Sequence, residues 1–114
     1  MVRIAFATNK GGLDDSLADR FGRAPTFTIV DVDESSGEVK EVKVIENPGA
    51  QAASGAGVKA AQAVADARAT VYAGPALGPN AYAALQSLGV KVITVTGTRV
   101  RDALRIVLEQ LRAK

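Results

Sequence analysis

The side chains best suited to chemistry in this sequence are two arginines in one short segment. Arg20 and Arg23 flank a Phe21-Gly22 pair, and Pro25 follows them closely. Guanidinium groups bind carboxylates and oxyanions through paired hydrogen bonds, so the segment predicts a binding site for an anion. The competing interpretation is that Phe21 fills the core while both arginines are solvated.

A glycine-rich turn, Gly55-Ala56-Gly57, opens an alanine-rich stretch that predicts a helix from about Val58 to Arg68. The first turn of a helix leaves backbone N–H groups without partners, so this turn, together with Ser54 before it, could seat an anion. The glycine spacing formally matches a dinucleotide fingerprint, but a long loop precedes it and no acidic residue ends the next predicted strand near Ala73. The competing interpretation is that the glycines only permit a turn and close packing of the helix.

Two further turns could add hydrogen-bond donors to the same place. Asn9-Lys10-Gly11-Gly12 resembles a phosphate-binding loop, but no Gly-Lys-Ser/Thr sequence follows it, which favours a flexible turn with one useful lysine. The segment from Gly74 to Pro79, which contains Gly78, links a predicted strand to a predicted helix and leaves further N–H groups free. Neither turn identifies a ligand by itself.

Composition excludes several classes of function. The chain has no cysteine and no histidine, which excludes disulfides, thiolate and imidazole metal ligands, and cysteine or histidine catalysis. Its 114 residues, 47% of them hydrophobic, predict a single domain over residues 1–114. A formal charge of only +2, and the absence of any apolar run approaching ~18 residues, predict no binding to nucleic acid or membranes. We therefore expect a soluble cytoplasmic protein.

Hydrophobic periodicity predicts three strands followed by alternating helices and strands. Ile4 and Phe6 alternate with other residues in the first strand, and the third strand is charged enough for a sheet edge. Val58 belongs to the apolar face of the first helix. The last helix has one apolar stripe through Leu104, with Thr98 placed to cap it. The predicted strands cover 2–7, 26–32, 39–46, 70–73 and 90–95, and the predicted helices cover 58–68, 79–88 and 100–111.

This order of elements favours an α/β fold with a five-stranded mixed sheet, strand order 3-2-1-4-5, an antiparallel second strand and helices on both faces. The loops after strands one, three and four would then meet the residues before strand two at the carboxyl edge of strand one. Open α/β sheets bind their ligands at such an edge. The segments expected to converge there are Asn9-Lys10, Arg20 to Pro25, Ser54 to Gly57 and Gly74 to Pro79.

Four motifs, in order along the chain, resemble those of a known family. They are Phe21-Gly22-Arg23-Ala24-Pro25 before a strand, Asn47-Pro48-Gly49 after the hairpin, Gly55-Ala56-Gly57 opening a helix, and Ala73-Gly74 with Gly78-Pro79. The sequence is similar, from about Ile4 to about Leu108, to the nitrogenase iron-molybdenum cofactor biosynthesis domain. The resemblance implies a ribonuclease H-like three-layer fold and a role, related to nitrogen fixation, in binding or carrying an iron-molybdenum cofactor or its iron-sulfur precursor. It also implies cofactor-assembly proteins as partners.

The sequence departs from the family at two positions. Members often carry histidine just before the Phe-Gly-Arg and just before the Gly-Ala-Gly, where this sequence has Arg20 and Ser54. Without imidazole or thiolate ligands, a metal cluster would be held as a polyanion by Arg20, Arg23, Lys10 and backbone N–H groups. We expect a monomer that binds such a cofactor, or a small anion, transiently and without catalysis. The predicted cofactor-binding residues, which include no metal ligand and no catalytic residue, are Asn9, Lys10, Arg20, Phe21, Gly22, Arg23, Ser54, Gly55, Gly57, Gly74 and Gly78.

An alternative function is a metal-dependent nuclease or phosphotransferase, which a ribonuclease H-like fold suggests. Two-metal chemistry needs several carboxylates around one point. The first strand carries none, and the convergent loops offer mainly Asp14, Asp15 and Asp19. A non-enzymatic binding module therefore agrees better with the sequence.

Overall fold

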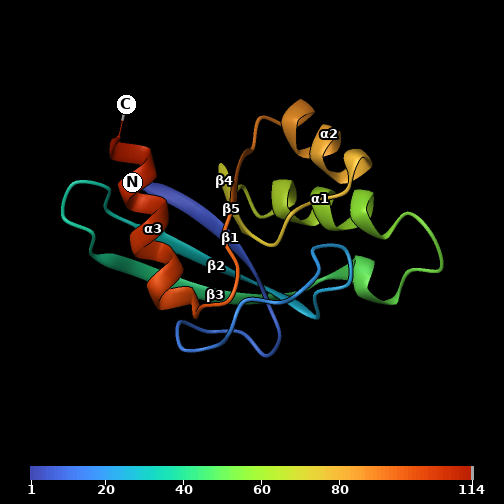
Figure 1. The fold of residues 1–114 in the computed structure, drawn as a ribbon, viewed down its shortest axis with the longest axis horizontal. Helices are drawn as coiled ribbons and strands as arrows, with labels where there is room; N and C mark the ends of the chain where they lie inside the picture. Colours follow the sequence, from blue (N-terminus) through green and yellow to red (C-terminus); the bar gives the residue numbers. More distant parts are fainter. Residues whose placement is uncertain (114) are drawn as a thin grey trace.

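The computed structural model describes residues 1–113, which contain five strands and three α-helices in the predicted order (Figure 1). They also contain one 3-10 helix that the sequence did not predict. The elements are β1 (Val2–Thr8), β2 (Thr26–Val32), β3 (Val39–Glu46), η1 (Pro48–Gln51), α1 (Ala56–Asp66), β4 (Val71–Gly74), α2 (Pro79–Ser87), β5 (Lys91–Thr94) and α3 (Val100–Arg112). None of the helices in this part of the chain is long and apolar enough to span a membrane.

The strands form one sheet in the order β3-β2-β1-β4-β5, which confirms the predicted order. β2 runs antiparallel to both β1 and β3, whereas β4 runs parallel to β1 and to β5. β1 therefore lies at the centre of the sheet, and Ile4 and Phe6 are fully buried there, as predicted. β3 forms one edge, where its lysine and glutamate side chains discourage pairing with foreign strands.

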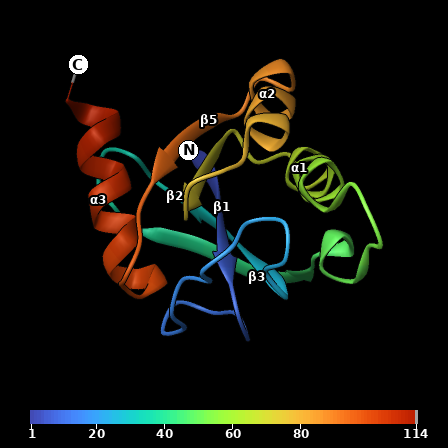
Figure 2. The same cartoon turned by 45° about the vertical axis from the view of Figure 1, so that its right-hand side comes forward.

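Helices cover both faces of the sheet (Figure 2). α3 packs on the face that carries Ile4 and Phe6, and α1 and α2 pack on the face that carries Ala5 and Ala7. Side chains alternate between the two faces of a strand, so β1 turns its large residues to α3 and its alanines to α1 and α2. The small side chains let the alanine-rich α1 approach the sheet closely, and Val64 of that helix is fully buried.

The apolar stripe of α3 is buried as predicted, with Leu104 only 6% exposed. The predicted cap at Thr98 is wrong, because the N-cap residue is Arg99 and no side chain caps the helix. The first N–H groups of α3 are instead donated to the carbonyl oxygens of Leu13 and Asp15, at N···O distances of 2.8 and 2.9 Å. Backbone acceptors from a distant loop thus replace the side-chain cap.

The first helix differs from its prediction in two ways. α1 begins and ends two residues earlier than 58–68, because Gly55 already occupies the N-cap position with a φ of 69°. Val58, predicted on the apolar face, is 50% exposed. The buried residues of α1 are Ala60, Ala61 and Val64. At 3.6 residues per turn, Val58 lies ~110° around the helix axis from the middle of the face formed by these three residues, so it flanks the buried face.

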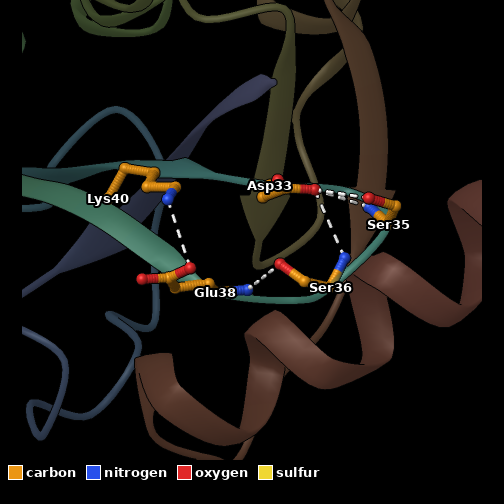
Figure 3. A network of polar contacts seen from close by, with 5 residues as sticks. All are labelled: Asp33, Ser35, Ser36, Glu38 and Lys40. Carbon is orange, nitrogen blue, oxygen red and sulfur yellow. Dashed lines mark hydrogen bonds and ion pairs between the residues drawn. The ribbon is translucent and has the colours of Figure 1, made fainter.

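A compact turn joins β2 to β3 and closes the predicted hairpin (Figure 3). The Oδ1 atom of Asp33 accepts hydrogen bonds from Ser35 Oγ, Ser35 N and Ser36 N, at 2.7, 2.9 and 3.3 Å. These bonds, the one from the Ser35 hydroxyl above all, hold the pKa of Asp33 below its usual value. Glu38 pairs with Lys40 at 3.1 Å where β3 begins.

Candidate functional site

A pocket of about 360 Å³ lies where the loop before β2, the start of α1 and the start of α2 meet. Part of the convergence predicted from the strand order is therefore present. The predicted binding residues that line the pocket are Arg20, Phe21, Gly22, Arg23, Gly57 and Gly78. The fold thus brings the arginine segment together with two glycine-containing helix starts.

Phe21 is buried and anchors the arginine segment in the core. Its ring centroid lies 4.9 Å from that of Tyr72 in an edge arrangement and 5.5 Å from that of Phe27 in a tilted one. Aromatic pairs favour these geometries. Arg20 and Arg23, on either side of this anchor, are exposed. The core position of Phe21 therefore fixes both arginines at the rim of the pocket.

A buried asparagine in the loop after β3 holds the arginine segment in place. Asn47 is 3% exposed, and its Oδ1 accepts a hydrogen bond from Gly49 N at 2.9 Å. Its Nδ2 donates to the carbonyl oxygens of Phe21 (3.3 Å), Gly22 (3.2 Å) and Ala24 (2.9 Å). The sequence marks Asn47 only as part of a turn motif. The hydrogen-bond partners of Asn47 lie in another loop, so no local sequence pattern indicates that it holds the arginine segment in place.

Three glycines allow backbone segments to touch beside the pocket. A side chain at Gly49 would collide with the carbonyl oxygen of Ala56. A Cβ atom at Gly22 would lie 3.1 Å from the backbone nitrogen of Gly57, and one at Gly57 would lie 3.1 Å from the Cβ of Ala81. Gly57 therefore serves close packing of α1 against α2, which is the competing interpretation of that glycine turn.

Arg23 is partly engaged in the fold. Its Nη1 atom donates to the carbonyl oxygens of Ala52, Ala50 and Gly49, at 2.7, 3.2 and 3.5 Å, around the carboxyl end of η1. A cation at a helix carboxyl end stabilises carbonyls that lack partners there. The side chain of Arg20 has no hydrogen-bond or ion-pair partner among residues 1–113. Arg20 is thus the cation that the pocket can offer in full to a ligand.

Three further predicted residues lie near the pocket but do not line it. Ser54 and Gly55 are exposed just before α1, and the left-handed conformation of Gly55 favours glycine. Gly74 is buried, and a side chain there would collide with the hydroxyl of Tyr72. Burial raises the pKa of Tyr72, which keeps the hydroxyl protonated and able to donate to the carbonyl oxygen of Pro75 at 2.9 Å. Gly74 therefore shapes the loop that leads to α2.

The Asn9-Lys10 turn does not line the pocket either, and its backbone N–H groups bind a carboxylate of the same loop. The backbone nitrogens of Asn9, Lys10 and Gly11 lie 2.9, 2.8 and 2.8 Å from Oδ2 of Asp15. Burial acts to raise the pKa of Asp15, but these backbone hydrogen bonds, with one from Ser16, outweigh it and hold the pKa below its usual value. An internal anion thus fills the turn that resembles a phosphate loop.

The pocket favours a ligand with negative charge. Its charged side chains are Arg20, Arg23 and Asp19, so cations outnumber anions. The starts of α1 and α2 add partial positive charge, and no side chain within residues 1–113 caps either of them. Within residues 1–113, no group of three or more acidic, histidine or cysteine side chains could hold a metal ion. The arrangement can therefore bind an anion through charge and hydrogen bonds, and it offers no imidazole or thiolate to a metal.

Comparisons with known proteins agree with the resemblance seen in the sequence. A family model described as dinitrogenase iron-molybdenum cofactor matches residues 1–110. An uncharacterized protein of Methanocaldococcus jannaschii is 28% identical over 96 residues, which cover 84% of this chain and 80% of that protein.

Two solved structures share both sequence and fold with this chain. The apo form of the orange protein from Desulfovibrio gigas is 35% identical, with a TM-score of 0.83 over 96% of this chain and 89% of that chain. A protein from Thermotoga, described as a "putative NifB protein" of the DUF35 family and solved by NMR, is 33% identical, with a TM-score of 0.75 over 96% of this chain and 89% of that chain.

Proposed function

We propose that this chain, which belongs to the dinitrogenase iron-molybdenum cofactor family, is a non-enzymatic binding or carrier protein for an iron-molybdenum cofactor or its iron-sulfur precursor. The observation that carries the proposal is the pocket at which Arg20, Arg23 and two helix starts meet. The family, with the orange protein among its structural relatives, supports a cofactor-binding role.

The pocket would hold its cargo as an anion. Arg20 supplies a complete guanidinium group, and Arg23 supplies the N–H groups that do not bind the end of η1. Backbone N–H groups at the start of α1 add neutral donors. Because the chain has no cysteine or histidine, no thiolate or imidazole bond to the metal forms. Binding by charge is readily reversed, which suits delivery of the cargo to a cofactor-assembly protein.

The carboxylates of the described residues give the nuclease or phosphotransferase alternative no support. Asp14 forms an ion pair with Arg101 at 3.1 Å, and Asp15 accepts the N–H groups of the Asn9-Lys10 turn. Asp19 alone lines the pocket. Two-metal chemistry needs several carboxylates around one point, whereas Asp14 and Asp15 are engaged in separate contacts and only Asp19 of the three lines the pocket.

The test is anaerobic mixing with isolated iron-molybdenum cofactor, followed by gel filtration and metal analysis. Arg20→Ala should weaken binding about tenfold, because it removes one charge-assisted contact. Its thermal stability should match that of the wild type, since the side chain has no partner in the fold described for residues 1–113. Arg105→Ala, at an exposed position of α3, is the control and should leave binding unchanged.

Ionic strength separates binding by charge from direct metal ligation. Exposed charges are screened over ~10 Å at 0.1 M salt, so affinity should fall as salt rises. Equal binding by the wild type and both variants, or binding that is indifferent to salt, would refute the proposed site.

A further inference from the structure

A second cavity, of about 530 Å³, lies between α1 and the β2–β3 half of the sheet. It shares no lining residue with the pocket at Arg20. We call it the α1–β3 groove, and its apolar lining includes Ile29, Ile45 and Ala63. Cavities of about 300–1,000 Å³ with an apolar lining and a few polar groups are the usual sites for small ligands.

Pairing between β2 and β3 fixes the order of charges along one wall of the groove. Glu41 stands opposite Asp31, and Lys43 stands opposite Ile29. Both pairs line the groove, and they are separated by one step of the two-residue strand repeat. Along β3, the acidic pair of Asp31 and Glu41, here called the acidic row, is therefore followed by the basic side chain of Lys43.

The other wall of the groove is one side of α1. Lys59, Ala63 and Asp66 line it at positions i, i+4 and i+7, which share one side of a helix. The carboxyl end of α1 lies at the acidic row, because Arg3 Nη1 donates to the carbonyl oxygen of Ala67 at 2.9 Å. Asp66 therefore lies near the Glu41 end of the groove, and Lys59 lies toward the other end.

One ion pair at the acidic end is already satisfied. Arg3 and Asp31 form two hydrogen bonds, Nε to Oδ1 at 2.7 Å and Nη2 to Oδ2 at 3.0 Å. The side-chain hydrogen bond from Arg3 holds the pKa of Asp31 below its usual value, so the pair remains ionised. Glu41 and Asp66 line this end of the groove and form no ion pair within residues 1–113. The charge of Arg3 also attracts Glu41. Gln62 Nε2 donates a hydrogen bond to Asp66 Oδ1 at 2.9 Å.

The charged side chains that have no ion-pair partner in the described residues are thus separated by sign along the groove. Lys43 and Lys59 have no ion-pair partner in the described part of the chain. At ~1.5 Å of rise per residue, Lys59 and Asp66 are ~10 Å apart along α1. A fully extended chain of three residues spans about the same length.

We propose that the α1–β3 groove binds a short free peptide of about three residues with an apolar central side chain. Its ammonium group lies at Glu41 and Asp66, its carboxylate lies at Lys59, and its central side chain covers Ile29. A simple anion or a simple cation matches only one end of the groove, whereas a zwitterion matches both. The site is separate from the proposed cofactor pocket and does not depend on it.

The test uses the tripeptide alanyl-leucyl-alanine, titrated into the full-length protein and followed by two-dimensional NMR of backbone amides. Saturable shifts should appear at residues of β3 and α1 that line the groove. Acetylation of the amino end, or amidation of the carboxyl end, should each weaken binding by about threefold to tenfold, because each removes a contact between exposed charges.

Variants assign the binding to the groove. Lys59→Gln should weaken binding of the free peptide by about threefold to tenfold and should leave binding of the amidated peptide unchanged. Lys91→Gln, at an exposed position of β5, is the matched control and should have no effect. Arg20→Ala should also have no effect, which distinguishes failure here from failure of the cofactor site. Thermal melts of each variant confirm that it is folded.

Other occupants would give different results. Octanoate that binds as tightly as the peptide would identify an apolar anion as the ligand and overturn the proposal. Groove resonances that shift with protein concentration in the absence of peptide would identify a second copy of the chain, with the same consequence. The proposal is equally overturned if no saturable shift appears at millimolar peptide, or if the capped and free peptides bind alike.

Discussion

Replacement of Asn47 by alanine should show how strongly the rim of the cofactor pocket depends on one buried amide. Its Oδ1 accepts from Gly49 N, and its Nδ2 serves three carbonyl oxygens of the arginine segment. Alanine leaves these backbone groups without partners in a region closed to water, since Asn47 is only 3% exposed. A buried polar group that loses its partner costs more than the net value of the lost bond.

The expected loss follows from the number of hydrogens available. The amide carries two N–H groups and one acceptor oxygen, so about three full hydrogen bonds are lost at about 1 kcal/mol each. We expect the free energy of unfolding to fall by about 2–4 kcal/mol and the melting temperature by about 10–15 °C in a domain of this size. Urea denaturation and thermal melts measure both. Asn80→Ala, at an exposed position near the start of α2, is the control and should change stability by less than about 0.5 kcal/mol.

The substitution Asn47→Asp tests the acceptor and the donor roles of the Asn47 side chain separately. The substitution keeps an acceptor for Gly49 N but turns a carboxylate oxygen toward three carbonyl oxygens. Near pH 7 it should therefore destabilise the protein at least as much as alanine, and less so in acid, where the protonated acid regains a donor. A loss below about 1 kcal/mol for Asn47→Ala, or an aspartate variant as stable as the wild type at pH 7, would refute the role assigned to this residue.

Three further changes test other parts of the structure. Leu104→Ala should cost about 2–5 kcal/mol in urea denaturation, because it leaves a cavity in the buried stripe of α3, and a loss below about 1 kcal/mol would mean that this helix is peripheral. Gly49→Ala should cost about 1–3 kcal/mol in the same assay, because its methyl group meets the backbone of Ala56, and an unchanged midpoint would contradict the close packing. Asp15→Asn should destabilise the protein at pH 7. The pKa of Asp15 is lower in the folded state, so the ionised carboxylate stabilises the fold above the unfolded pKa of ~3.9, and this stabilisation is lost as pH falls through the folded pKa. The difference in unfolding free energy between Asp15→Asn and the wild type should therefore shrink in acid. A difference that stays constant across pH would contradict this account.

The fold could be predicted from the sequence where one pattern dominates a whole element. The alternation of Ile4 and Phe6 placed β1 in the core, and the stripe through Leu104 placed α3 against it. The order of elements then limited the topology to a sheet that the structure confirms. The cap of α3 could not be predicted, because its acceptors are the carbonyl oxygens of Leu13 and Asp15 in a loop far away in sequence.

The candidate site was predictable as a meeting of segments but not in its internal contacts. Topology alone places Arg20 and Gly57 near each other, and both line one pocket. It gives no indication that Asp15 folds back to accept the backbone N–H of Lys10, or that Arg23 binds carbonyls of the neighbouring loop. Such contacts depend on side-chain direction within loops, where the sequence has no periodicity to read.

Asp15 joins two parts of the molecule that the chain places far apart. Its carboxylate binds the N–H groups that follow β1, and its own carbonyl oxygen accepts the N–H of Val100 at the start of α3. A fluctuation that opens this loop therefore exposes both sets of amides in one event. The amide hydrogens of Lys10 and Val100 should exchange with deuterium at similar rates and with the same dependence on denaturant, as members of one cooperative unit. The loop that contains Asp15, near the other end of the chain, would then protect the first turn of α3 from solvent.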